Sequence, residues 1–88
     1  MITTKQVNAI AAEIEILGVD EATVSGLRQQ YQAIHFTYCM DDDLPNNTPV
    51  IEHKDFNLYL IDGREHCLCL TNDYDAATGI VVAEIIPD

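Results

Sequence analysis

Cysteine and histidine are the residues of this sequence with the most versatile chemistry. The chain contains three of each, and Cys67 and Cys69 form a Cys-Leu-Cys pair. Residues two apart on a strand project from one face, about 6.6 Å apart along the backbone, so the two thiolates could share one metal ion. Two ligands do not complete a metal site, however.

A metal or iron–sulfur carrier is therefore the alternative function, because it requires at least three ligands to converge in space. Its candidate ligands are Cys39, Cys67, Cys69, His35 and His66. On an extended strand His35 and Cys39 share a face but are separated by about 13 Å. Free cysteine is among the most buried residue types, so we favour core packing for the cysteines and predict no metal and no cofactor.

Catalysis by a cysteine nucleophile would need Cys39 to contact a base, and His35 and Asp41 are the neighbours that could serve. An extended backbone keeps His35 too far away for that contact. The sequence also lacks a glycine-rich phosphate or oxyanion loop. We therefore predict that the protein is not an enzyme and has no catalytic residue.

An acidic run, Asp41-Asp42-Asp43, opens a long loop that continues to Pro49. Counted from Asp41, three later side chains fall at ligand positions of a calcium loop, but Pro45 carries no side-chain oxygen and Asn46 replaces the required glycine. The run is therefore a solvated strand end, a docking surface or, at most, a weak surface cation site. The predicted partner-binding residues are Asp41, Asp42, Asp43, Tyr59, Arg64 and His66.

Length and charge narrow the classes of function. The 88 residues are enough for one domain, residues 1–88, with a single modest core. The net charge of −11 opposes binding to nucleic acid or anionic lipid and favours a basic protein partner, a cation or simple solubility. With no apolar run long enough to span a membrane and no apolar signal core, we expect a cytoplasmic protein with reduced thiols.

Apolar spacing predicts two helices at the start of the chain. Thr3 and Gln6 have the form of a capping box, and apolar residues follow at three- and four-residue spacing, so a helix is expected at about 4–17. Gly18 suits the position after that helix, and Asp20 can cap a second helix at about 21–32.

Alternating patterns then predict strands at about 33–40, 56–61, 64–71 and 79–86. Asp62-Gly63 is a hairpin signal, and a two-residue turn there would place Ile61 opposite Arg64. The predicted core face of this hairpin comprises Phe56, Leu58, Leu60, Cys67 and Cys69. The predicted fold is α+β, with an N-terminal helical hairpin on one face of a roughly four-stranded antiparallel sheet and the other face partly exposed.

Three stretches, 35–43, 56–71 and 76–79, together with most of the remaining chain, resemble a family of short, uncharacterised bacterial proteins associated with nitrogen fixation. The genes of that family tend to lie among those for nitrogenase. The resemblance implies a cytoplasmic accessory role in nitrogenase assembly, protection or regulation, and it supplies no catalytic or binding residue. We therefore expect a non-enzymatic binding protein whose partner is a component of nitrogenase or of its assembly machinery, and whose free sheet face could also close a homodimer.

Overall fold

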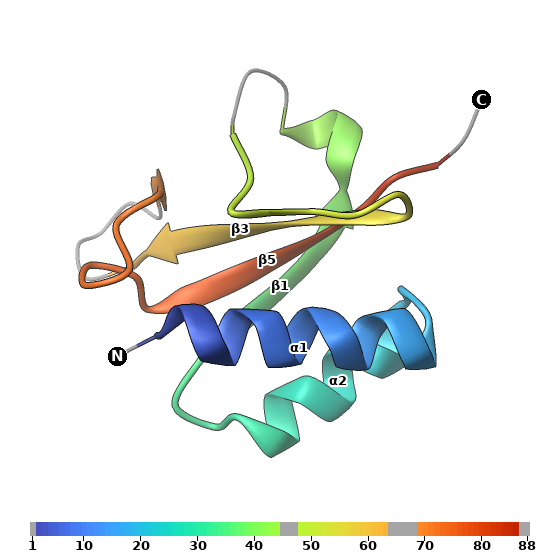
Figure 1. Cartoon of the computed structure of the whole chain (residues 1–88), viewed down its shortest axis with the longest axis horizontal. Helices are drawn as coiled ribbons and strands as arrows, with labels where there is room; N and C mark the ends of the chain where they lie inside the picture. Colours follow the sequence, from blue (N-terminus) through green and yellow to red (C-terminus); the bar gives the residue numbers. More distant parts are fainter. Residues whose placement is uncertain (1, 45–47, 64–68, 87–88) are drawn as a thin grey trace.

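Two antiparallel-running helices at the N-terminus pack on one side of a sheet in the computed structural model, which describes residues 2–44, 48–63 and 69–86 (Figure 1). Helix α1 (Thr4–Leu17) begins with the expected capping box, in which Thr3 Oγ1 accepts a hydrogen bond from the Gln6 amide at 3.1 Å. It ends at Gly18, whose φ of 96° suits glycine. Both predicted boundaries of this helix are confirmed.

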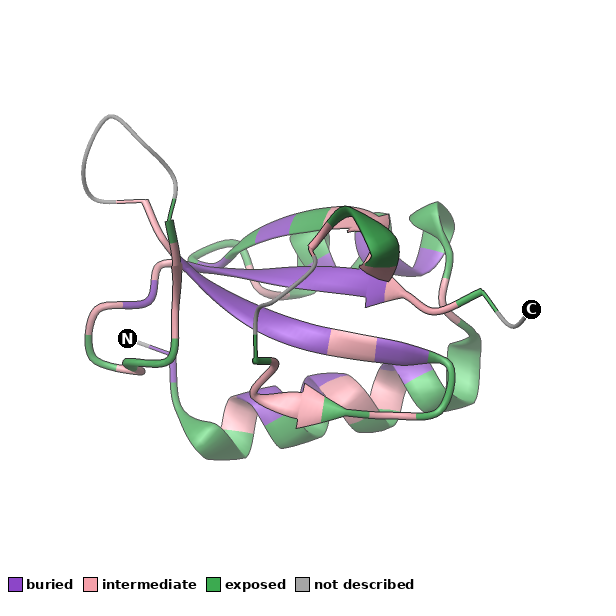
Figure 2. Ribbon diagram, turned by 90° about the horizontal axis from the view of Figure 1, so that it is seen from above, coloured by how far each residue is buried: buried purple, intermediate pink, exposed green. Residues whose placement is uncertain are grey.

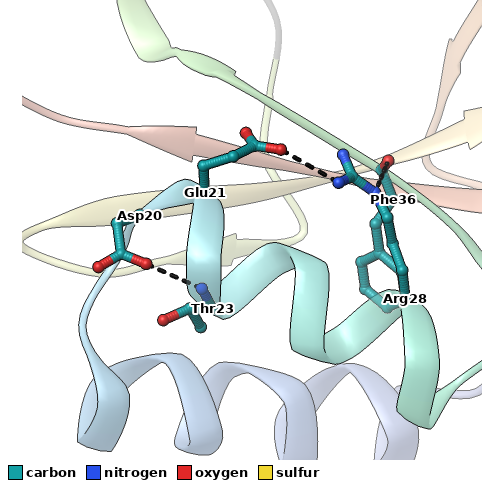
Figure 3. A network of polar contacts seen from close by, with 5 residues as sticks. All are labelled: Asp20, Glu21, Thr23, Arg28 and Phe36. Atoms are coloured by element: carbon teal, nitrogen blue, oxygen red, sulfur yellow. Dashed lines mark hydrogen bonds and ion pairs between the residues drawn. The ribbon is translucent and has the colours of Figure 1, made fainter.

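Helix α2 (Glu21–Gln30) is capped by Asp20, whose carboxylate accepts a hydrogen bond from the Thr23 amide at 2.8 Å (Figure 3). It ends two residues earlier than predicted. Near its end, Arg28 donates to the Phe36 carbonyl at 3.3 Å and to Glu21 at 3.1 Å. Since Phe36 lies on an edge strand, Arg28 satisfies a carbonyl that the sheet leaves unpaired.

The sheet is mixed, whereas an antiparallel sheet was predicted. Strands β1 (His35–Met40), β5 (Gly79–Glu84), β3 (Phe56–Asp62) and β2 (Ile51–Glu52) lie side by side in that order, and β4 (Cys69–Thr71) also pairs with β3. Strand β5 is inserted between β1 and β3, parallel to β1 and antiparallel to β3. The α+β class and the N-terminal helical hairpin are confirmed, and the short strand β2 was not predicted.

The predicted two-residue turn at Asp62-Gly63 is wrong. Ile61 lies opposite Leu70 rather than Arg64, and Asp62 lies opposite Cys69. A two-residue turn would require Ile61 to exchange hydrogen bonds with Arg64, but the Ile61 carbonyl accepts a hydrogen bond from the Thr78 amide at 2.7 Å. Residues 64–68 of the predicted strand 64–71, including Arg64, His66 and Cys67, lie outside the described residues.

The main core lies between the helices and the facing side of the sheet (Figure 2). Alternate residues of β3 and β5 supply its centre, as the strand pattern predicted for Phe56, Leu58 and Leu60. The largest fully buried side chains are Phe56, Ile10, Ile14, Leu27, Leu58, Leu60, Ile80, Val7, Val24 and Val82. Cys69 was predicted to belong to this core, but it is exposed. In the observed register it pairs with Asp62, at the end of β3, whereas Leu60 pairs with Thr71.

The second face of the sheet is more buried than predicted. Tyr59, Ile61, Val81 and Ala83 form a second apolar cluster, against which Leu44 packs together with Cys39 and Leu70. The central strand is therefore apolar on both faces. No helix within the described residues is long and apolar enough to cross a membrane.

Candidate functional site

The acidic run forms a short 3₁₀ turn, Asp41–Asp43, directly after β1 and on the side of the sheet opposite the helices (Figure 1). The last residue pair between β1 and β5 is Met40 with Glu84, so the three aspartates lie just beyond the paired part of β1. The Leu44 amide closes it by donating to the Asp41 carbonyl at 3.0 Å. This turn is the most concentrated charge within the described residues, and we take it as the candidate site.

Asp41 fastens the turn to the sheet. Its Oδ1 accepts one hydrogen bond from the Tyr59 hydroxyl and another from Asn57 Nδ2, both at 2.9 Å. Asn57 and Tyr59 are two residues apart on β3 and therefore project from the same face. Strand alternation placed these two side chains together, but the sequence did not reveal that Asn57 would hold the acidic run.

Asp42 and Asp43 are exposed, and the described residues include no hydrogen-bond partner of either side chain. Among the described residues, the ion pairs are Arg28 with Glu21 and, where its ring is protonated, His53 with Glu15, so neither carboxylate has a described cationic partner. Carboxylates on adjacent residues repel one another, and the net charge of −11 adds to that repulsion. As far as the described residues show, the turn therefore presents negative charge to solvent.

Tyr59 does not belong to the exposed surface, although it was predicted to bind the partner. Only 3% of it is exposed, and its role is to hold Asp41 through its hydroxyl. Burial raises the pKa of Tyr59, and the hydrogen bond to Asp41 raises it further. The other two predicted contact residues, Arg64 and His66, lie outside the described residues.

Three of the five candidate metal ligands lie within the described residues. Cys39 is half-buried on the second sheet face, where burial and the charges of Asp43 and Asp41 raise the pKa of its thiol. His35 and Cys69 are exposed. Within the described residues, no three His, Cys, Asp or Glu side chains are grouped so that they could hold a metal ion, while Cys67 and His66 lie outside those residues.

Two cavities accompany these features. One of about 350 Å³ lies beside the start of β1, where His35 is the one titratable side chain among the described lining residues. A second of about 190 Å³ lies between the end of α1, the β2–β3 turn and the end of β5. The sequence patterns pointed to neither cavity, since each is assembled from segments far apart in the chain.

Comparison with known proteins identifies a family without a mechanism. A family model described as "Family of unknown function (DUF6129)" matches residues 9–85. No curated protein and no solved structure is significantly similar to the chain. The matched range includes the acidic turn and the segments that line both cavities.

Proposed function

We propose that this chain, which belongs to the DUF6129 family of unknown function, is a non-enzymatic accessory protein that docks on a basic partner protein through its acidic turn Asp41–Asp43. The resemblance to proteins associated with nitrogen fixation makes a component of nitrogenase or of its assembly machinery the proposed partner. Cytoplasmic location and a role in assembly, protection or regulation are part of the same proposal.

The observation that carries this proposal is the anchoring of the acidic turn. The two hydrogen bonds from Asn57 and Tyr59 to Asp41 attach the turn to the central strand, while Asp42 and Asp43 stay exposed. A charged surface that is already fixed in place loses less conformational entropy when it binds than a flexible acidic tail does. A turn that is attached to the sheet through Asp41 therefore supports a role in recognition better than a role in solubility alone.

The net charge supports the same function. The electric field of a protein with a net charge of −11 attracts a positively charged protein from a distance and accelerates association. This effect weakens as salt screens the charges. The same field repels phosphate groups, so the proposal includes no binding to nucleic acid or membranes.

The test is affinity capture from nitrogen-fixing cells with the wild-type protein and with the double variant Asp42→Asn/Asp43→Asn. These two side chains are exposed, so the fold should be unchanged. The proposal expects a basic partner that is retained at low salt, released at high salt and reduced in amount with the variant. Equal capture by both proteins, or a partner whose retention does not depend on salt, would refute a docking role for the acidic turn.

A further inference from the structure

The cavity at the end of α1 combines an apolar wall with an acidic rim. Buried Ile14 and Phe56 line its wall, and three acidic residues, Glu15, Asp55 and Glu84, line it from three separate segments. Its volume of about 190 Å³ is sufficient for a side chain rather than for a large ligand. The cavity is separate from the acidic turn, none of whose residues line it.

His53 and Tyr38 hold the rim in place. The His53 ring stacks on Phe56 with centroids 4.4 Å apart, its Nδ1 accepts a hydrogen bond from the Asp55 amide at 3.2 Å, and its Nε2 lies 3.8 Å from Glu15 Oε2. An accepting Nδ1 leaves the proton of the neutral ring on Nε2, which faces Glu15. On β5, Glu84 accepts a hydrogen bond from the Tyr38 hydroxyl.

The adjoining end of α1 departs from the pattern that stabilises a helix by itself. The C-terminus of a helix carries partial negative charge and favours basic residues, but the last turn of α1 has none and contains Glu15 instead. The last two positions, where polar residues would normally face water, are Ile16 and Leu17, with 82% and 64% of their surface exposed. Local departures of this kind are expected where a surface serves binding.

The charges near the cavity are unbalanced. Besides His53, the described basic side chain in the adjoining turn is Lys54, which is exposed and forms no ion pair with a described residue. The carboxylates are not grouped closely enough for any described set of three to hold a metal ion. The cavity is therefore suited to a larger organic cation with an apolar stem.

We propose that this cavity receives a lysine or arginine side chain of a partner protein, while an apolar neighbour of that residue packs on Ile16 and Leu17. The apolar stem of such a side chain would lie along Phe56, and its charged end would reach the carboxylates on the rim. The proposal deepens the docking function proposed above and rests on it, because it names a second contact for the same kind of basic partner.

Peptide binding to the full chain tests the inference. The probe is the unlabelled peptide acetyl-Leu-Lys-Leu-Arg-Leu-amide, and its control carries acetyl-lysine and citrulline in place of the two cations. Amide NMR spectra of the ¹⁵N-labelled protein locate the contact. The probe should shift the amides of Gly18, Val19 and Ile85 in a saturable manner, and the uncharged control peptide should not.

Two double variants with the same change in net charge separate this cavity from the acidic turn. Glu15→Gln/Asp55→Asn should weaken binding about tenfold, because two ion pairs with the peptide are lost, whereas Asp42→Asn/Asp43→Asn should weaken it by less than about twofold. Ile16→Ser/Leu17→Ser, which leaves the charge unchanged, should also weaken binding. All of these side chains are exposed, so folding should be preserved.

Three results would overturn the inference. The first is equal weakening by both charge variants, which indicates attraction by the overall field; the second is equal binding of the uncharged peptide. The third is a set of shifts confined to the amides around Asp41–Asp43, in which case the acidic turn remains the docking site and the cavity has no part in it.

Discussion

Replacing Leu58 by alanine measures how much the fold depends on the helix-facing side of the central strand. Leu58 is fully buried, and it lies opposite Val82 on β5 and Ile51 on β2. The substitution removes about three methylene equivalents, worth about 2.4 kcal/mol by transfer, and the cavity that remains raises the cost to about 2.5–5 kcal/mol. A domain of this size has a total stability of about 4–13 kcal/mol, so the loss is a large fraction of the whole.

Leu17→Ala is the matched control, because it makes the same chemical change at a position that is 64% exposed. Its effect on the free energy of unfolding should stay below about 0.5 kcal/mol. Urea unfolding followed by far-ultraviolet circular dichroism is the suitable assay, since the chain lacks tryptophan. The melting temperature of Leu58→Ala should fall by at least about 10 °C.

A cost below about 0.5 kcal/mol for Leu58→Ala, or an equal cost for Leu17→Ala and Leu58→Ala, would contradict this prediction. Either result would mean that the helices do not cover the face of β3 that carries Leu58. A change in the slope of the unfolding free energy against urea concentration would instead indicate a change in the surface exposed on unfolding. In that case a shift of the midpoint alone would not measure the change in stability.

Three further predictions concern other parts of the molecule. The hydrogen bond to Glu84, together with burial, raises the pKa of Tyr38 to about 12. Because the pKa of tyrosine in the unfolded chain is near 10, the stability that this contact contributes below about pH 10 should be lost as the pH rises toward 12. In unfolding experiments across that range, Tyr38→Phe should show a smaller loss of stability. Gly79→Ala should destabilise the protein by about 1–3 kcal/mol in thermal unfolding, because the added Cβ would lie 2.7 Å from the His35 carbonyl oxygen, and a neutral effect would contradict the parallel register of β1 and β5. Elemental analysis of protein purified without oxygen should find far less than one metal atom per chain, and a stoichiometric metal would revive the carrier hypothesis.

The candidate site was predictable from the sequence only in part. The run Asp41–Asp43 was recognisable from charge alone, and two of its carboxylates are exposed as a docking surface requires. The role of Asp41 was not recognisable, because its partners Asn57 and Tyr59 lie 16 and 18 residues away along the chain. The acidic cavity was hidden for the same reason, since its rim is assembled from three distant segments.

Local chemistry determined the helices and the faces of the strands. The capping box at Thr3 and Gln6, the glycine at position 18 and the carboxylate cap at Asp20 each act within a few residues, so α1 and the start of α2 follow from the sequence. Alternation along β3 likewise identified Leu58 and Leu60 as core residues, because side chains on a strand alternate between its two faces.

Tertiary structure decided which strands are neighbours and in what register. Alternation gives the face of a residue but not the strand beside it, so the insertion of β5 between β1 and β3, parallel to β1, could not be read from the pattern. The position of β5 also prevents a two-residue turn at Asp62-Gly63. Such a turn would need the Ile61 carbonyl as a hydrogen-bond acceptor, but this carbonyl accepts its hydrogen bond from the Thr78 amide. That contact between segments distant in sequence, rather than local turn propensity, places Ile61 opposite Leu70 and leaves Cys69 exposed.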